Sequence, residues 1–178
     1  MADQMAEPTI EHRPRIGLAA SRFNHFIVEQ LVAGARDALQ RSGFSEQQQE
    51  LIWVPGAFEL PLLADRMAAT GRFDAIVTLG AVIRGGTPHF EFVAGECASG
   101  LARVALDHGL PVVFGVLTTD TVEQALQRAG TGQGNKGFDV AMTAVEMIQT
   151  LQQLRDGPVC DGSVGDSSVC GDSAGSGQ

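Results

Sequence analysis

The segment Gly85-Gly86-Thr87-Pro88-His89 carries the residue types best suited to chemistry. Its two glycines free the backbone to turn N–H groups toward one point, a predicted helix N-terminus follows, and the Thr87 hydroxyl is a further donor. This combination predicts an anion nest, and phosphate is the anion that it suits. The segment is not a P-loop, because no Gly-Lys-Ser/Thr sequence follows it.

His89 stands directly beside this predicted nest. A histidine on its own is more often a surface residue or a hydrogen-bonded structural one. Beside a phosphate site, an imidazole that exchanges protons near neutral pH has a use as proton donor and acceptor. His12, His25 and His108 have no such neighbours. His89 is therefore the candidate catalytic residue.

Phe23 and Glu59 belong to two other segments that follow predicted strands, residues 21–24 and 54–61. An aromatic residue directly after a strand is either a hydrophobic staple that packs on the next helix or a platform for a flat heterocycle. Either the positive end of a helix dipole stabilises the negative charge of Glu59, or the Glu59 carboxylate accepts hydrogen bonds from two hydroxyl groups of a ligand. Both alternatives stay open for both residues.

Phe114, Arg128 and Lys136 come later in the chain. By itself, Phe114 predicts a core residue. Arg128 ends a predicted helix, where it either stabilises the helix C-terminus or presents a fork-shaped donor to a phosphate. Lys136 opens the last predicted helix. A phosphate donor at Arg128 would supply the local positive charge that an acidic protein lacks elsewhere.

Alternating apolar runs and helical periodicity supply the elements that position these residues. The apolar runs that predict strands are 16–20, 51–54, 75–83 and 112–117. The segments with helical periodicity are 27–39, 59–69, 93–104, 121–128 and 141–151. Successive β-then-α units predict an α/β fold, a single-domain open parallel sheet of about four strands flanked by helices in a flavodoxin-like three-layer sandwich. Such a sheet binds ligands at the carboxyl ends of its strands, where the candidate residues stand.

The composition is 44% apolar and 19% charged over 178 residues, which is typical of a soluble globular protein. No segment is long and apolar enough for a transmembrane helix, and residues 1–11 lack the apolar core of a secretory signal. We therefore expect a cytoplasmic protein with no membrane partner. The formal net charge is −9, without a basic stripe. This charge excludes nucleic acid as the main partner, so any phosphate needs a local site.

The three cysteines include no C-x-x-C pair, so they indicate neither a disulfide scaffold nor a zinc site, and no metal is expected. Cys97 falls on an apolar helical stripe and predicts a small core residue. Cys160 and Cys170 lie in a tail rich in Gly, Ser and Asp. The expected divisions are a flexible segment at 1–13, one folded domain at 14–155 and a disordered, low-complexity acidic tail at 156–178.

Taken jointly, these segments resemble the signature set of the 6,7-dimethyl-8-ribityllumazine synthase family. The segments that carry the resemblance are 21–24, 54–61, 80–93, 114–120, 128–130 and 134–137. They match in order and spacing from about Arg15 to Leu154. The Gly-Ala-Phe-Glu and Val-Ile-Arg-Gly-x-Thr-x-His segments are highly specific to that family.

The resemblance implies a transferase of riboflavin biosynthesis. 5-Amino-6-(D-ribitylamino)uracil would condense with 3,4-dihydroxy-2-butanone 4-phosphate to give 6,7-dimethyl-8-ribityllumazine, inorganic phosphate and water. The substrate's own amine is the nucleophile, so no cofactor, metal or activated serine is expected. The enzyme would hold two molecules in reacting geometry and move protons, which implies His89 as the catalytic proton donor and acceptor.

The resemblance also implies a role for each matching residue. The residue that would stack on the pyrimidine is Phe23. The residues that would hold the ribityl chain are Ala57, Phe58 and Glu59. The residues whose backbone would read the pyrimidine edge are Ala81, Val82 and Ile83. The residues that would bind the phosphate of the butanone are Gly86, Thr87 and Arg128. The residues that would come from a neighbouring subunit, close the site and bind the ribitylaminouracil are Phe114 and Lys136.

A homo-oligomer with active sites between subunits follows from the same resemblance. Residues 131–133 lack the lysine often seen there in shell-forming members, and they also lack the insertion that resembles pentamer-only members. A pentamer is expected, and the short connection favours an icosahedral shell of pentamers, with riboflavin synthase as a candidate partner. The tail beyond Leu154 has no counterpart in the family pattern.

Two other functions stay open. A flavodoxin-like binding module would hold a flavin or nucleotide without converting it, although His89 beside the nest then has no clear purpose. A family member that has lost activity would only form a shell. Fluorescence of the product on mixing the two substrates separates the enzyme from both, and the native mass reveals a shell.

Overall fold

The computed structural model describes residues 13–130 and 134–157. Its strands form one four-stranded parallel sheet with the order β2-β1-β3-β4. The strands are β1 (Ile16–Ser21), β2 (Gln49–Val54), β3 (Ala75–Ile83) and β4 (Val112–Thr119). The four predicted strands and their parallel arrangement are confirmed.

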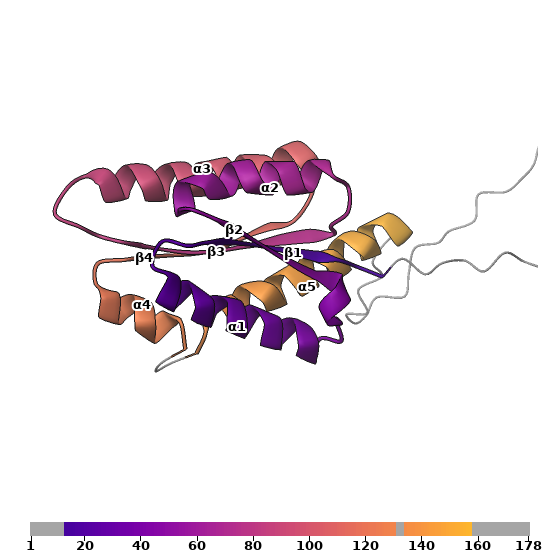
Figure 1. Ribbon diagram of the computed structural model, residues 1–178. Coiled ribbons are helices and arrows are strands. Elements are labelled where there is room, and N and C mark those ends of the chain that lie inside the picture. The colour runs from indigo at the N-terminus through magenta and orange to yellow at the C-terminus, as the bar shows by residue number, and fades with distance from the viewer. Residues whose placement is uncertain (1–12, 131–133, 158–178) are drawn as a thin grey trace, which may run out of the picture.

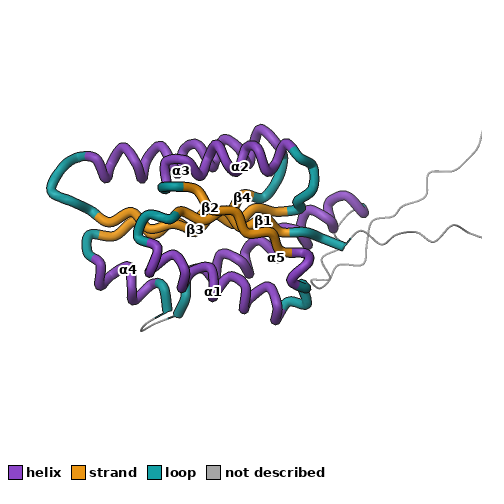
Figure 2. The backbone as a smooth tube through the Cα atoms, viewed as in Figure 1, coloured by secondary structure: helices purple, strands orange, loops and turns teal. Residues whose placement is uncertain are grey.

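Helices follow the strands and cover both faces of the sheet. The helices are α1 (His25–Arg41), α2 (Leu60–Ala69), α3 (His89–His108), α4 (Val122–Arg128) and α5 (Lys136–Asp156), with short 3-10 turns η1 (Glu46–Gln48) and η2 (Ala57–Glu59). Figures 1 and 2 show α2 and α3 on one face and α1, α4 and α5 on the other. The predicted α/β three-layer sandwich is therefore confirmed. None of the described helices is long and apolar enough to span a membrane.

Two apolar clusters form the core, one on each face of the sheet. Leu18 and Val77 belong to the cluster under α1 and α5, while Ala19 and Ile76 belong to the cluster under α2 and α3. Consecutive strand residues enter opposite clusters because side chains alternate across a strand. Both faces are covered, so these strands read as continuous apolar runs. Cys97 is fully buried in the second cluster, as predicted, and burial raises the pKa of its thiol to about 11.

The strands extend beyond the apolar runs that predicted them. β2 begins at Gln49, which pairs with Ile16, and β4 ends at Thr119, which pairs with Ile83. These added residues are polar, and backbone pairing with a neighbouring strand keeps them in the sheet. Hydrophobicity alone therefore marks only the most buried part of each strand.

The sheet divides between β1 and β3 at its carboxyl end. β3 pairs with β1 only as far as Leu79, opposite Ala20, but it pairs with β4 as far as Ile83. The chain also turns in opposite directions from this point, because β2 lies beyond β1 and β4 lies beyond β3. A division of this kind is the place where open α/β sheets bind ligands.

Candidate active site

A pocket of about 670 Å³ opens at this division of the sheet. Its walls come from the β1–α1 turn, from η2, from the end of β3 and from the start of α3. The predicted site residues that line it are Phe23, Ala57, Phe58, Glu59, Ala81, Val82, Ile83, Thr87 and His89. Gly86 is not among its lining residues, although both of its chain neighbours are. One cavity therefore collects nine of the residues that the sequence singled out from three separate loops and one strand.

Phe23 is held over the pocket by its backbone. Its N–H donates to the Pro55 carbonyl at 3.0 Å, which continues the pairing of β1 and β2 past the strands. Asn24 follows with a left-handed φ of 58°, and its Nδ2 donates to the Ala81 carbonyl at 2.9 Å. The Phe23 side chain is 69% exposed. This exposure does not support a hydrophobic staple, and a stacking platform stays the prediction.

The last residues of β3 offer backbone groups to the pocket. Because β1 stops pairing at Leu79, the side of β3 that faced β1 has no strand beside Ala81 and Ile83. The Asn24 side chain occupies part of this gap through the Ala81 carbonyl. Backbone N–H and C=O groups left at a strand edge are strong hydrogen-bonding groups. Such groups can form hydrogen bonds with a ligand that enters the gap.

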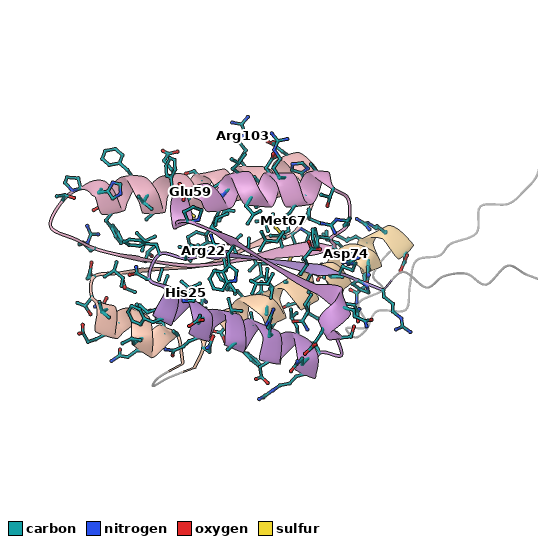
Figure 3. All side chains as sticks on the ribbon, viewed as in Figure 1. Arg22, His25, Glu59, Met67, Asp74 and Arg103 are labelled. Carbon is teal, nitrogen blue, oxygen red and sulfur yellow. The ribbon has the colours of Figure 1, made fainter. Side chains whose placement is uncertain are left out.

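Glu59 ends η2, immediately before α2. Its side chain forms no capping hydrogen bond to the helix, and it lines the pocket instead. Figure 3 labels Glu59 at the start of α2, well away from Asp74 at the opposite end of the sheet. A Cβ at Gly56 would lie 3.0 Å from the Glu59 carboxylate, so glycine allows this close approach. Glu59 therefore does not cap α2 through a hydrogen bond, although its charge stands at the helix N-terminus, and its carboxylate is available to accept hydrogen bonds from a ligand.

His89 is the first residue of α3 and is exposed in the pocket. Within the described part of the chain, its ring forms no hydrogen bond or ion pair. By contrast, His108 lies 2.9 Å from an Asp65 carboxylate oxygen, and His25 packs against Trp53 with ring centroids 4.9 Å apart. His89 is thus not a structural histidine held by neighbours.

The loop before His89 differs from the predicted nest. Neither Gly85 nor Gly86 has a positive φ, and a Cβ at either position would meet nothing within 4 Å. The loop therefore lacks the left-handed residue of an αR-αL nest, and binding of an anion by its backbone stays a prediction. The Thr87 hydroxyl and the N-terminus of the long helix α3 remain as groups that favour an anion.

Arg84 has a structural role that the sequence did not indicate. Its guanidinium contacts Glu91, bonds to Asp120 at 2.8 Å and lies over the Phe90 ring at 4.2 Å. Its backbone N–H donates to the Thr119 carbonyl at 2.8 Å. The hydrogen bonds to Glu91 and then Asp120 raise the pKa of Arg84. This cation joins the start of α3 to the end of β4, and two carboxylates already neutralise it.

The other predicted cations lie in a second pocket of about 330 Å³, at the edge of β4. It is lined by Phe114, Arg128 and Lys136 and shares no lining residue with the first pocket. Phe114 is 38% exposed, so its prediction as a core residue is wrong. The reason is that β4 is an edge strand, where Phe114 has a neighbouring strand on one side only. Within one chain, Arg128 is not in the pocket of Thr87.

Sequence comparison decides the family of this chain. The sequence model of the 6,7-dimethyl-8-ribityllumazine synthase family matches residues 13–152. The chain is a member of this family. A 6,7-dimethyl-8-ribityllumazine synthase of Desulfatibacillum aliphaticivorans is 55% identical to it over 141 residues, which are 79% of this chain and 91% of the relative. The 6,7-dimethyl-8-ribityllumazine synthase of Edwardsiella ictaluri (strain 93-146) is 58% identical over 142 residues, with the same coverage of 79% and 91%.

The region shared with the lumazine synthase family contains both pockets. The matched residues begin before β1 and end within α5, so they include the whole sheet and all five helices up to that point. The predicted tail at 156–178 lies outside the match, and from residue 158 on, with Cys160 and Cys170, it also lies outside the described residues, whereas Asp156 is the last residue of α5. Most of the predicted flexible segment at 1–13 lies outside both as well.

Proposed function

We propose that this chain catalyses the reaction of its family. 5-Amino-6-(D-ribitylamino)uracil condenses with 3,4-dihydroxy-2-butanone 4-phosphate to give 6,7-dimethyl-8-ribityllumazine, inorganic phosphate and water in riboflavin biosynthesis. The observation that carries the proposal is the 670 Å³ pocket, where an exposed aromatic ring, a carboxylate and an unpaired imidazole meet beside the end of β3 in a member of this family.

The ribitylaminouracil occupies the first pocket in this proposal. Phe23 stacks on the pyrimidine, and backbone groups of residues 81–83 bind the pyrimidine edge at the gap beside β1. Glu59, together with the neighbouring residues Ala57 and Phe58, holds the ribityl chain. A carboxylate without another partner suits vicinal hydroxyl groups, since it accepts hydrogen bonds at both oxygens. The exposure of Phe23 and the free carboxylate of Glu59 support this arrangement.

The phosphate of the butanone binds at Gly86 and Thr87, with Arg128 as its cation. Arg84 is the cation nearest to this loop in sequence, but Glu91 and Asp120 already hold it. Arg128 lies in the second pocket, so a neighbouring subunit supplies it together with Phe114 and Lys136. A homo-oligomer with sites between subunits follows, a pentamer and, by assembly of pentamers, an icosahedral shell that can enclose riboflavin synthase. The exposure of Phe58 and Phe92, both in the first pocket, supports a covering neighbour.

His89 moves protons during the condensation. The amine of the uracil attacks the ketone, and a first water leaves to form an imine. Elimination of phosphate then leaves an enol that becomes a carbonyl group. The ribitylamino nitrogen attacks this carbonyl carbon and closes the second ring with loss of a second water. Each step transfers a proton to or from a reacting atom, and an imidazole without another partner can accept and return it. Holding both substrates contributes up to roughly 7–11 kcal/mol, and the proton transfers add a factor of roughly 10²–10⁴.

Replacing His89 by alanine tests the mechanism. We expect His89→Ala to slow turnover by roughly 10²–10⁴-fold, since general acid–base catalysis has that size. Product fluorescence on mixing both substrates measures the rate, and circular dichroism shows whether the fold is retained. His108→Gln is the matched control, because His108 ends the same helix outside the pocket. Normal turnover of His89→Ala would remove His89 from the mechanism, and no lumazine from the unmodified chain would favour a binding module or an inactive shell protein.

A further inference from the structure

The Asn135 side chain joins three helices through its amide. Its Nδ2 donates to the Gln30 carbonyl at 2.8 Å and to the Ala129 carbonyl at 2.8 Å, and its Oδ1 accepts from the Phe138 N–H at 3.2 Å. Gln30 belongs to α1, Ala129 directly follows α4, and Phe138 is in the first turn of α5. Both amide donors and the acceptor are therefore in use.

Glycines make room for this amide and for close packing of α1 on α5. A Cβ at Gly34 of α1 would overlap the Asn135 amide, and a Cβ at Gly137 of α5 would overlap the Leu31 backbone. Gly130 has a φ of 105°, and a Cβ there would lie 3.0 Å from the Asn135 Nδ2. The surroundings therefore fit this side chain closely, and a different geometry would require the helices to separate.

Asn135 lies between the two cations of the second pocket. Arg128 directly precedes Ala129, and Lys136 directly follows Asn135. Both side chains are exposed, and among the described residues neither forms an ion pair; Arg128 has only a 3.4 Å contact from Nη1 to the Gln124 carbonyl of its own helix. The separation of the two cations is consequently set by the backbone segments that Asn135 ties together, including an isolated bridge between Ala129 and Asn135.

We propose that Asn135 is a positioning residue of the active site, which holds Arg128 and Lys136 at the separation that binds the phosphorylated substrate. The inference rests on the proposed function, in which Arg128 binds the phosphate. Asn135 does not touch the substrate. It acts through the end of α4 and the start of α5, and so its loss weakens binding of the phosphate without removing either cation.

Two substitutions remove the hydrogen bonds from Asn135 to Gln30 and Ala129 but keep an acceptor for the cap of α5. Asn135→Asp retains an oxygen that can accept from the Phe138 N–H, but it loses both donors and faces two carbonyls with a carboxylate. Asn135→Ser also retains an acceptor for the cap, because serine is a good N-cap residue, while its hydroxyl is too short to reach α1 and Ala129 together. The serine variant keeps the test available if the aspartate variant fails to fold.

Steady-state kinetics of the full chain, with each substrate varied in turn, tests the proposal. For both Asn135 variants we expect the KM for the butanone phosphate to rise about 10-fold, and up to about 100-fold, since a small misplacement far from the chemistry has effects of that size. The KM for the ribitylaminouracil should change less. In the double variant Arg128→Gln/Asn135→Ser, the two effects on the butanone phosphate KM should be less than multiplicative, because both act on the same contact.

Thr121→Ala is the matched control. The Thr121 hydroxyl caps α4 at its other end by accepting from the Gln124 N–H at 3.2 Å, and Thr121 lines neither pocket. Loss of such a cap costs about 1 kcal/mol of stability. We expect a lower unfolding midpoint with an unchanged KM for the butanone phosphate.

The outcomes distinguish the inference from the proposed function. If Arg128→Gln raises the KM for the butanone phosphate but the folded Asn135 variants do not, or if their effects multiply, the inference is overturned while the phosphate site stands. If Arg128→Gln leaves that KM unchanged, the phosphate assignment itself is wrong, and the inference fails with it.

Discussion

Phe23, Glu59 and His89 are exposed in one pocket, and within the described residues neither Glu59 nor His89 forms a hydrogen bond or ion pair with another side chain. Exposed groups of this kind lower the stability of the fold little, and they remain able to contact a ligand. Arg84 is the opposite case, because its charge is used within the protein. Glu59 and His89 therefore differ from Arg84 in that their hydrogen-bonding groups remain available to a ligand.

Glu59→Gln tests whether the Glu59 carboxylate binds the ribityl chain. Glutamine keeps the size of the side chain but loses the charge and one acceptor, and a hydrogen bond to a charged group contributes about 1.5–3 kcal/mol. We expect the KM for the ribitylaminouracil to rise roughly 10- to 100-fold. The KM for the butanone phosphate should stay nearly constant in the same assay. An equal rise in both values would contradict a contact with the ribityl chain.

Cys97 gives the fold a pH dependence in alkaline solution. Burial raises the pKa of its thiol from the ordinary 9.0 to about 11, so the folded state keeps the proton that the unfolded state releases. This contribution to stability is complete below pH 9 and is lost as the pH rises toward 11. Cys97→Ala should be less stable at neutral pH because of the cavity that it leaves, and this difference should shrink between pH 9 and 11. Urea unfolding at several pH values measures it, and a constant difference would contradict the shift.

At the scale of elements, Arg84 anchors the loop between β3 and α3. The contact with Glu91 joins the two ends of the loop, and the bond to Asp120 fixes both to the turn after β4. The side chain of Arg84 is itself partly exposed, so these ion pairs add little to global stability. Their effect should therefore appear in the position of Thr87 and His89.

Arg84→Gln should lower kcat/KM about 10-fold or more, because the loop that carries Thr87 and His89 is no longer held in place. The urea midpoint should hardly move, since solvent screens ion pairs between exposed side chains and they add little to stability. Arg103→Gln is the matched control: Arg103 pairs with Asp107 at 3.2 Å on the same helix and projects away from the sheet in Figure 3. Equal effects of the two substitutions on kcat/KM would show that the loop does not depend on Arg84.

At the scale of the whole molecule, the candidate residues fall into two pockets that share no lining residue. A single chain therefore keeps these two sets of candidate residues apart. In the proposed function, the aromatic rings of the first pocket and the cations of a neighbour's second pocket together bind the substrates. Closed rotational symmetry lets every subunit offer its first pocket to the second pocket of a neighbour.

Mixing two inactive variants tests this arrangement. His89→Ala removes a group of the first pocket and Arg128→Gln a group of the second. Equal amounts of the two variants are unfolded and refolded together. At each interface of a closed ring, the first pocket is intact in about half of the cases, and so, independently, is the neighbour's second pocket. About one interface in four should therefore combine two intact pockets. Activity of about a quarter of the unmodified protein is expected, with sedimentation as the measure of assembly. Mixed oligomers without recovered activity would show that each site lies within one chain.

The sequence by itself determined the strands, the helices and most residues of the first pocket. Hydrophobic periodicity and short motifs are local properties, and the carboxyl ends of parallel strands meet at one edge of a sheet, so loops at those ends converge wherever the fold is α/β. This is why Phe23, Glu59 and His89 could be grouped before any contact was known.

The tertiary structure alone decided which groups are used and which are free. Phe114 reads as a core residue, but the strand order places it on an edge strand. Asn135 stands next to the start of a predicted helix, but its amide also bonds to Gln30, 105 positions away in the chain. Arg84 received no role from the sequence, but folding brings Asp120 to it. Strand order and contacts between distant residues arise only when the layers pack. A short sequence pattern does not specify which surfaces will pack together.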